Sequence, residues 1–524
     1  MRLAALASAV PHLLLGPALD PDVTSVTHDS RRAGPGALFA AFEGLAHDGR
    51  LYVAEAAARG AVAALGARPA PVPLPVPWVE VERPREAAGL LAARLAGEPS
   101  GRLVMAGVTG TSCKTTTTLL LDRVLSAALG KAGLFGTLVY RGAGGEAASL
   151  VASRTTPEAT DLQPMLAALV ADGGKAAAME CSSHALALSR LAGCRFDVAV
   201  FTNLTRDHLD YHATMEEYFE AKALLFSLLK ARGTAAVNLD DPWGARLFER
   251  LPEERRLGFS LEGVPAARLS AVASLSTTGT LLSLHDRRTG ARWEVSSPLL
   301  GRPNAENLLA ASAASLALGI PADVAAAALG AVGLVPGRLE AVPNSLGLTL
   351  LVDYAHKPGA LEGVLKTARS LAAGGKVVCV FGCGGDRDRG KRPEMGRIAA
   401  RLADATVLTS DNPRSEEPRA ILDEIRAGCG SSGPSPLVIV DRREAIEAAL
   451  RLAAPGDVVL IAGKGHEDYQ EARGTRTPFD DRVVAREILS RLEGGLATAG
   501  KVGKVGKVGK AGKVGKAGKA GGDA

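Results

Sequence analysis

Residues 103–118 read Leu-Val-Met-Ala-Gly-Val-Thr-Gly-Thr-Ser-Cys-Lys-Thr-Thr-Thr-Thr, and apolar residues at helical spacing continue from Leu119 to Leu129. A strand, a loop of small residues and a helix form a phosphate cradle, in which backbone N–H groups and the helix N-terminus meet the anion. We expect Lys114 to supply a point charge and Thr115 to hold Mg²⁺ beside a nucleotide. The alternative is a threonine-rich helix start with a solvated lysine.

Cys113 departs from the usual form of this loop. Glycine normally precedes the lysine, because the backbone must approach phosphate closely there. A Cβ atom at this position is disfavoured at positive φ and tolerable at negative φ. We expect a working loop in which Cys113 adopts an allowed backbone conformation, with weakened ATP affinity and a thiol open to oxidation.

Length and composition indicate several domains. The chain has 524 residues, of which 47% are hydrophobic, and about 150 residues per domain suggests about three domains. Composition changes divide the chain into residues 1–98, 99–336 and 337–495, with a tail at 496–524. The six cysteines lack metal-ligand spacing, which favours a reducing cytoplasm. No run reaches the roughly 18 apolar residues of a membrane helix, so we expect no membrane insertion.

The net charge of +5 comes from the tail. The residues after Gly500 repeat Lys, Gly and Val or Ala and include seven lysines and one aspartate, which leaves the rest of the chain at −1. The near-neutral charge of the rest of the chain predicts no basic surface for binding nucleic acid. We expect a disordered tail, which is either a dispensable extension or a contact for polyanions such as nucleic acid or anionic lipid.

Polar runs follow two more predicted strands of the central segment. Residues 176–179 lead to Glu180-Cys-Ser-Ser-His184, and residues 197–201 lead to a run that contains His208. Alternating strands and helices predict an α/β fold with a parallel sheet, whose ligands sit beyond the carboxyl ends of the strands. We therefore expect the phosphate loop, Glu180 and His208 to share one crevice, where Glu180 and His208 suit Mg²⁺.

A second open α/β domain of the Rossmann-like type is predicted after residue 337. Its four predicted strands end at Asp353-Tyr-Ala-His-Lys-Pro358, Gly382-Cys-Gly-Gly-Asp-Arg-Asp-Arg389, Asp411-Asn-Pro-Arg414 and Gly463-Lys-Gly-His-Glu467. The guanidinium groups of Arg387 and Arg414 can each pair with a carboxylate through two hydrogen bonds. Solvated loop arginines are the alternative.

Eleven motifs from about residue 23 to 483 carry a family resemblance. They are His28-Asp-Ser-Arg31, the Gly-Thr-x-x-Lys-Thr-Thr loop at 110–116, Thr155-Thr-Pro157, Glu180-x-Ser-Ser-His184, Thr202-Asn-Leu-x-x-Asp-His-Leu-Asp-Tyr-His212, Asn304-x-x-Asn307, Gly337-Arg-Leu-Glu340, Asp353-Tyr-Ala-His-x-Pro358, Gly382-Cys-Gly-Gly-Asp-Arg387, Asp411-Asn-Pro-Arg414 and Gly463-Lys-Gly-His-Glu467. In this order they resemble the Mur ligase family. The resemblance implies a small α/β N-terminal UDP-binding domain, a central ATPase domain of the P-loop type and a C-terminal amino-acid-binding domain.

The resemblance also implies the ATP and metal ligands. The phosphates of ATP would lie on Gly110, Thr111, Ser112, Cys113, Lys114, Thr115 and Thr116. The nucleotide would also contact Asn304, Arg338, Asp353 and His356. Thr115 and Glu180 would hold one Mg²⁺, and His208 and Lys222 would hold another. Local spacing alone makes Lys222 a snorkelling surface lysine, but it matches the lysine that the family carbamylates, which turns the amine into a carboxylate-like group.

The two substrates of the family map onto further residues. The uridine end of the UDP-linked substrate would contact Ser30, Leu45, Ala46 and His47, and its muramoyl-dipeptide part would contact Thr155, Thr156, Ser182 and Arg190. The amino-acid site would comprise Arg387, Asp411, Asn412, Pro413, Arg414, Gly463 and Glu467. The Asp-Asn-Pro-Arg signature implies meso-diaminopimelate rather than lysine. A guanidinium fork can pair with the extra carboxylate of diaminopimelate, whereas Arg414 would repel the ammonium of lysine.

The implied reaction is amide ligation in cytoplasmic peptidoglycan precursor synthesis. ATP phosphorylates the D-glutamate side-chain carboxylate of UDP-MurNAc-L-Ala-D-Glu, and the diaminopimelate amine then attacks the acyl phosphate. Lys114, Lys222, His208 and Glu180 are the expected catalytic residues. We expect a monomer with small-molecule substrates and no specific nucleic acid, and closure of the C-terminal domain around ATP.

Two alternatives remain from the sequence. One is a folylpolyglutamate synthase, although the signature at 411–414 and the complete N-terminal domain argue against it. The other is a non-catalytic binding protein that lost ATP turnover through Cys113. Two further departures from the family affect single substrate contacts, since Arg154 replaces a common asparagine and Leu188 a common glutamine.

Overall fold

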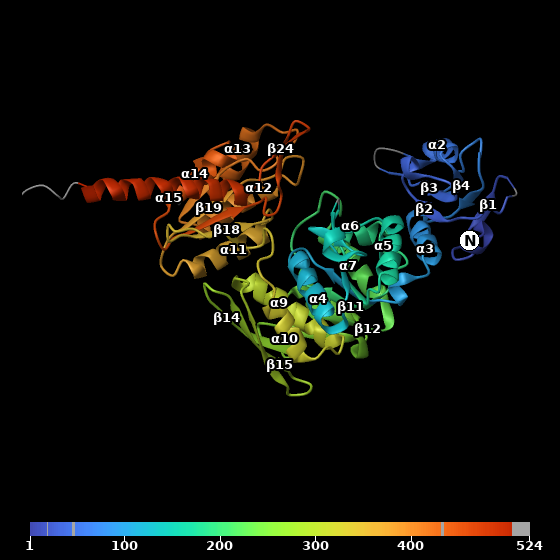
Figure 1. Ribbon diagram of the computed structural model, residues 1–524, viewed down its shortest axis with the longest axis horizontal. Helices are drawn as coiled ribbons and strands as arrows, with labels where there is room; N and C mark the ends of the chain where they lie inside the picture. Colours follow the sequence, from blue (N-terminus) through green and yellow to red (C-terminus); the bar gives the residue numbers. More distant parts are fainter. Residues whose placement is uncertain (18, 45–47, 153, 431–433, 506–524) are drawn as a thin grey trace, which may run out of the picture.

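The computed structural model describes residues 1–17, 19–44, 48–152, 154–430 and 434–505. Three β-sheets with flanking helices follow one another along the chain. Figure 1 shows the N-terminal unit and the C-terminal unit at opposite ends of the molecule, with the central unit between them. The expected three-part α/β fold is confirmed.

The N-terminal unit is a five-stranded sheet in the order β1-β5-β4-β3-β2. Its elements are α1 (Leu3–Ala7), β1 (Leu13–Leu15), β2 (Ser25–Thr27), β3 (Ala37–Ala40), α2 (Val53–Ala58), β4 (Ala61–Gly66), β5 (Trp78–Glu80) and α3 (Pro84–Leu95). The apolar start of the chain belongs to this core, because Leu3 and Leu6 of α1 are buried against it.

The central unit is an eleven-stranded mixed sheet in the order β16-β15-β14-β13-β12-β11-β6-β10-β7-β8-β9. Its strands are β6 (Val104–Thr109), β7 (Ala132–Phe135), β8 (Val139–Arg141), β9 (Leu150–Val151), β10 (Ala176–Glu180), β11 (Phe196–Phe201), β12 (Leu229–Asn238), β13 (Arg256–Ser260), β14 (Leu269–Leu275), β15 (Thr280–Asp286) and β16 (Arg292–Ser297). Its helices are α4 (Lys114–Leu129), α5 (Ala159–Ala171), α6 (Ser183–Ala187), α7 (Met215–Ser227), α8 (Pro242–Arg250), α9 (Gly301–Ala317) and α10 (Ala322–Gly330).

The register of three neighbouring parallel strands places the central polar loops together. β6 lies between β10 and β11, with Val108 opposite Glu180 on one side and Val200 on the other. The carboxyl ends of these strands therefore meet at one edge of the sheet. This confirms the expected convergence of the phosphate loop with the runs that follow β10 and β11.

The C-terminal unit is a six-stranded sheet in the order β17-β18-β22-β19-β20-β21, with a separate hairpin. Its strands are β17 (Glu340–Ala341), β18 (Thr349–Asp353), β19 (Val377–Phe381), β20 (Ala405–Leu408), β21 (Leu437–Val438), β22 (Val458–Ala462), β23 (Tyr469–Ala472) and β24 (Thr475–Pro478). Its helices are α11 (Pro358–Leu371), α12 (Lys391–Leu402), α13 (Pro418–Cys429), α14 (Arg442–Leu452) and α15 (Asp481–Val505). Within the six-stranded sheet, all pairings except that of β17 with β18 are parallel, and the separate β23–β24 hairpin is antiparallel.

The last helix crosses the predicted boundary between the C-terminal unit and the tail. α15 continues to Val505, past the predicted boundary at residue 495. The paired glycines at 494 and 495 do not end it, because no proline follows and Leu-Ala-Thr-Ala can continue a helix. Residues 506–524 lie outside the described part of the chain.

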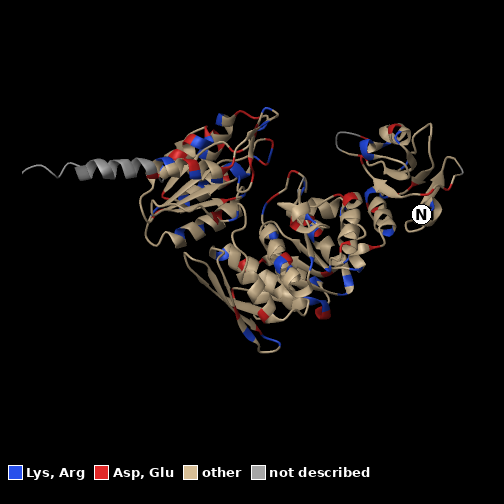
Figure 2. Cartoon of the chain, viewed as in Figure 1, with Lys and Arg blue, Asp and Glu red and all other residues tan. Residues whose placement is uncertain are grey.

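Lysine and arginine alternate with aspartate and glutamate over all three units (Figure 2). Within the described residues, none of the helices combines the length and apolar character needed to cross a membrane.

Candidate active site

The phosphate loop joins β6 to α4 and is held by hydrogen bonds to the backbone and side chain of Asn203, in the loop after β11. The Thr111 N–H donates to the Asn203 carbonyl at 2.9 Å, and the Ser112 N–H donates to Asn203 Oδ1 at 2.9 Å. Lys114 Nζ donates to the carbonyls of Gly110 and Thr111 at 2.8 and 3.0 Å. The lysine therefore lies folded over the loop, at the place where phosphate oxygens bind in such cradles.

Cys113 does not adopt the allowed conformation expected from the sequence. Its backbone lies at φ 72° and ψ −8°, in the left-handed region that glycine normally occupies. The expected reactivity of its thiol is also not supported. Burial, with Glu306 adding to it, raises the pKa of Cys113 to about 12, and the thiolate is the form that reacts. The loop keeps its shape because its contacts to Asn203 fix the neighbouring backbone.

Thr115 and Glu180 form the first cluster of oxygen donors. Thr115 Oγ1 donates to Glu180 Oε2 at 3.1 Å, and the Thr137 N–H donates to Glu180 Oε1 at 2.7 Å. Gly136 permits this approach, since a Cβ atom there would lie 2.5 Å from Glu180 Oε1. A hydroxyl and a buried carboxylate beside a phosphate loop are ligands suited to Mg²⁺.

Lys222 is buried rather than snorkelling, so the interpretation from local spacing alone is wrong. Its side chain is 1% exposed, and its Nζ donates to the Gly110 carbonyl at 2.8 Å. The ammonium also lies 4.4 Å from the centre of the Tyr218 ring. Burial holds the pKa of Lys222 well below its ordinary value, and the charge of Lys114 lowers it further. The amine is thus shifted toward its neutral, nucleophilic form.

His208 follows β11 and is connected to the C-terminal unit by Asp207, which pairs with Lys357. His208 Nε2 lies 3.0 Å from Asp207 Oδ2, and the same carboxylate oxygen lies 2.5 Å from Lys357 Nζ. Lys357 also reaches the Thr111 carbonyl, at 3.4 Å. Three lysines from different elements therefore approach the phosphate loop, and Asp207 links one of them, Lys357, to His208. His208 and Lys222 both border the Tyr218 ring.

A cavity of about 650 Å³ opens between the central and C-terminal units. Its volume lies within the range of small-molecule sites. The four residues expected to contact the nucleotide outside the phosphate loop all line it: Asn304, Arg338, Asp353 and His356. Arg338 joins the two units, because its Nη2 donates to Thr115 Oγ1 at 3.2 Å and its guanidinium lies 4.8 Å from the centre of the Tyr354 ring.

The same cavity extends to the residues expected for the muramoyl-dipeptide. Thr155 and Ser182 line it. Thr156 Oγ1 lies 3.3 Å from Ser182 Oγ, and Arg190 Nη1 donates to the Thr156 carbonyl at 3.4 Å. Arg190 also pairs with Glu158 at 2.9 Å.

Arg154, which replaces the common asparagine, pairs with Glu158 as well. Leu188 borders a small hollow beside Arg190. Ser30 lies on the N-terminal unit, two residues after His28, whose Nδ1 lies 2.7 Å from Thr160 Oγ1 of α5. Leu45, Ala46 and His47 lie outside the described residues.

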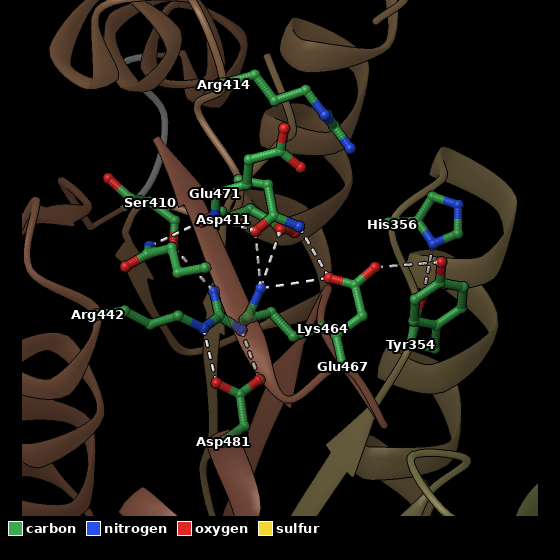
Figure 3. Close-up of polar contacts among 12 residues, drawn as sticks. Tyr354, His356, Ser410, Asp411, Arg414, Arg442, Lys464, Glu467, Glu471 and Asp481 are labelled. Atoms are coloured by element: carbon green, nitrogen blue, oxygen red, sulfur yellow. Dashed lines mark hydrogen bonds and ion pairs between the residues drawn. The ribbon is translucent and has the colours of Figure 1, made fainter. Parts of the chain in front are cut away.

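The expected amino-acid site occupies the strand ends of the C-terminal unit (Figure 3). Asn412 Nδ2 donates to Glu467 Oε2 at 2.8 Å, and the Tyr354 hydroxyl donates to Glu467 Oε1 at 3.4 Å. Lys464 Nζ, which is fully buried, donates to Asn412 Oδ1 at 3.0 Å and to Glu467 Oε2 at 3.2 Å. Burial and the nearby Asp411 raise the pKa of Glu467.

Two glycines bring the arginines of this site together. A Cβ atom at Gly384 would lie 2.9 Å from Arg414 Nη1 and 3.9 Å from Arg387 Cγ. Gly385 packs against the Pro413 carbonyl, which would lie 2.0 Å from a Cβ atom there. Arg414 Nη1 donates to the Gly385 carbonyl at 2.7 Å. Arg387 is exposed, and both guanidiniums lack a carboxylate partner among the described residues, as forks that accept an anionic ligand require.

Sequence reasoning missed four residues of this arrangement: Thr137, Asp207, Lys357 and Lys464. The sequence pattern around Lys464 could have indicated its role, because a lysine between two glycines at the end of an apolar strand lies where a buried strand leads into a site. Lys357 and Asp207 belong to different units, and nothing local in the sequence pairs them.

Three protein-family profiles match the chain. They are "Mur ligase family, catalytic domain" over residues 22–95, "Mur ligase middle domain" over 108–315 and "Mur ligase, glutamate ligase domain" over 337–465. Each profile covers one of the three sheets.

Relatives from several bacteria match nearly the whole chain. A protein of Synechococcus elongatus named UDP-N-acetylmuramoyl-L-alanyl-D-glutamate–2,6-diaminopimelate ligase is 46% identical over 500 residues, which is 94% of this chain and 99% of that protein. A protein of Streptomyces avermitilis with the same name is 46% identical, covering 91% and 94%.

Solved structures agree with these matches. One of a ligase with that name aligns with a TM-score of 0.64 at 33% identity, over 91% of this chain and 98% of the other. MurF from Acinetobacter baumannii, at 20% identity and a TM-score of 0.64, shares the fold. The profiles, the near-complete relatives and the three-sheet architecture agree, and the chain belongs to the Mur ligase family.

Proposed function

We propose that this protein is an ATP-dependent ligase that joins meso-diaminopimelate to UDP-MurNAc-L-Ala-D-Glu. One observation carries the proposal: a single cavity runs from the phosphate loop to Thr155 and Ser182 and borders Tyr354, whose hydroxyl reaches Glu467. Sites for a nucleotide, an acyl donor and an amine are therefore contiguous. The names of the relatives support this choice of substrates.

The reaction begins with transfer of the γ-phosphoryl group of ATP to the D-glutamate side-chain carboxylate, which releases ADP. Lys114 and Lys357 are two of the cationic residues that line the cavity, and they stabilise the negative charge spread over the transferring group. The diaminopimelate amine then attacks the acyl carbon. An amide bond forms, the bond to phosphate breaks, and the amine loses a proton.

The oxygen donors at the phosphate loop fit Mg²⁺. Thr115 and Glu180 already lie within hydrogen-bond distance of each other and would hold one ion. His208 and carbamylated Lys222 would hold a second ion. When bound, such ions neutralise phosphate charge. This chain's own residues orient the donors, since Thr137 fixes both carboxylate oxygens of Glu180.

Carbamylation of Lys222 is consistent with its environment. The neutral amine attacks CO₂, an N–C bond forms and one proton is released. Burial favours that neutral amine, and the product carboxylate would be surrounded by the cations of Lys114 and Lys357. The carbamate thus replaces a third crowded ammonium with an anion.

The amine site has groups that can contact both ends of diaminopimelate. Asp411 and Glu467 supply carboxylates for an ammonium, and Arg387 and Arg414 supply forks for the distal carboxylate. The UDP-linked substrate would contact Thr156 and Arg190 through its dipeptide and Ser30 through its uridine end.

We also propose the domain boundaries 1–98, 99–336 and 337–495 and a monomeric, cytoplasmic enzyme. Size-exclusion chromatography with light scattering tests the monomeric state, and a dimer at micromolar concentration would contradict it.

Phosphate release tests the function. The full chain should release phosphate from ATP only when UDP-MurNAc-L-Ala-D-Glu and meso-diaminopimelate are both present. L-lysine in place of diaminopimelate should give little release. Release with folate and glutamate instead would favour a folylpolyglutamate synthase, and no release with any pair would favour a binding protein.

A further inference from the structure

A buried ion pair lies directly behind the amino-acid site. Arg442, the first residue of α14, and Asp481, the first residue of α15, both have fully buried side chains. Arg442 Nε and Nη2 each donate to a different oxygen of Asp481, both at 2.7 Å. The pair is bidentate, which fixes the plane of the guanidinium.

The guanidinium also bridges two loops of the site (Figure 3). Its Nη1 donates to the Ser410 carbonyl at 3.2 Å, and its Nη2 donates to the Ala462 carbonyl at 3.0 Å. Ser410 directly precedes Asp411, and Ala462 directly precedes Gly463. One side chain thus contacts the residues before both halves of the amino-acid site.

The two bridged strands are not neighbours in the sheet. β19 lies between β22, which ends at Ala462, and β20, which leads to Ser410. Two strand spacings separate them, about 9–10 Å, so no ladder hydrogen bond between them sets their distance. Beyond the end of β19, Arg442 spans this gap at the base of the two loops, and Lys464 and Asn412 connect the loops farther along.

Glycine at position 463 completes the arrangement. Its φ is 117°, and a Cβ atom there would lie 2.8 Å from Asp411 Oδ2 and 3.8 Å from Arg442 Nη2. The Gly463 backbone therefore lies close to both the Asp411 carboxylate and the guanidinium. A shift of either loop would change the distance from Asp411 to the Gly463–Glu467 segment.

Helix stability accounts for Asp481, an acid in the first turn of α15, but not for Arg442. A cation at a helix N-terminus is disfavoured by the helix dipole, and Arg442 occupies that position. A buried ion pair is also often no more stabilising than hydrophobic residues of the same volume. The neighbouring exposed pair of Arg443 and Glu487, at 2.7 Å, already links the same two helices.

We infer that Arg442 and Asp481 are positioning residues that set the separation of the Asp411–Arg414 and Gly463–Glu467 loops and thereby the affinity for diaminopimelate. The inference rests on the proposed function, which identifies these loops as the amine site. Lys464 acts in the same sense within the site, by holding Asn412 and Glu467 together.

The test replaces the pair by apolar residues, Arg442→Met with Asp481→Leu, so that no unpaired charge stays buried. Steady-state phosphate release gives the KM of each substrate. We expect the KM for meso-diaminopimelate to rise about tenfold or more, as misplaced binding groups produce, with the KM values for ATP and the UDP-linked substrate within twofold of wild type. The matched control, Arg443→Met with Glu487→Leu, should leave all three unchanged.

Equal KM values for diaminopimelate in the double variant and wild type would overturn the inference, and so would a parallel rise of all three KM values. If the double variant does not fold, the isosteric Asp481→Asn variant, checked by its melting curve, should show the same selective rise on a smaller scale. Failure of the proposed function looks different, because wild type itself would then show no diaminopimelate-dependent release.

Discussion

Replacing Cys113 by glycine tests whether the phosphate loop carries backbone strain. Cys113 lies at φ 72°, and a side chain in the left-handed region costs about 1–2 kcal/mol. Glycine removes that cost but has more freedom in the unfolded chain, which opposes the gain by about 0.5–1 kcal/mol. The net expectation is a stabilisation of about 0.5–1 kcal/mol.

Thermal unfolding measures this difference. For a unit of this size, 1 kcal/mol shifts Tm by about 2–4 °C, so Cys113→Gly should raise the Tm of the central unit by about 1–4 °C. Its ATP affinity should also rise, because glycine allows phosphate to approach the backbone more closely. The control is Cys113→Ala, which removes the thiol but keeps the Cβ atom and the left-handed conformation.

The two variants separate the backbone from the thiol. If strain is the cause, the alanine variant melts no higher than wild type and only the glycine variant gains. Equal gains in both would assign the effect to the thiol. A lower Tm in the glycine variant would refute the reasoning, since it would mean that residue 113 is unstrained.

Three further predictions concern charged residues. Lys357→Met removes one cation of the cavity and leaves the Asp207 carboxylate without its closest partner. We therefore expect the KM for ATP to rise about tenfold or more. An unchanged KM for ATP would make Lys357 a structural contact only. Arg414→Gln removes a charged fork, and we expect the KM for meso-diaminopimelate to rise about 10- to 100-fold; the reasoning fails if L-lysine loses affinity to the same extent. Hydrogen bonding from buried Arg392 lowers the pKa of Glu416 to about 2. The contribution of the ionised Glu416 to folding stability is therefore complete above the ordinary pKa of glutamate and fades as pH falls toward 2. Glu416→Gln should therefore cost about 1.5 kcal/mol at pH 7, and its deficit in denaturant melts should shrink on acidification; a deficit that grows would contradict the assignment.

The sequence predicted the fold well because strand and loop signals are local. The apolar run before Gly110 and those before Glu180 and Asp411 each end at a polar residue, and parallel pairing then places these ends at one edge of their sheets. The convergence of the central loops follows from topology alone. Individual side-chain contacts were not needed for it.

The rest depends on contacts that no local pattern encodes. Periodicity placed Lys222 on a surface, but the fold buries its ammonium against the Gly110 carbonyl. Lys357 meets Asp207 across two units, at a separation fixed only by how the units pack. The conformation of Cys113 is set by Asn203, far along the chain, which holds the residues before it. In each case a tertiary contact overrides the local preference.

The shared walls of the cavity also govern how the protein melts. Arg338 and Lys357 of the C-terminal unit and the phosphate loop of the central unit border the same space, so a nucleotide bound there belongs to the native state of both units. Binding to the native state alone raises stability by mass action. In calorimetry, the ligand-free units would melt as separate heat-absorption peaks, whereas saturating ATP would merge these two peaks into one cooperative transition, so the shape of the thermogram reports whether the interface is formed.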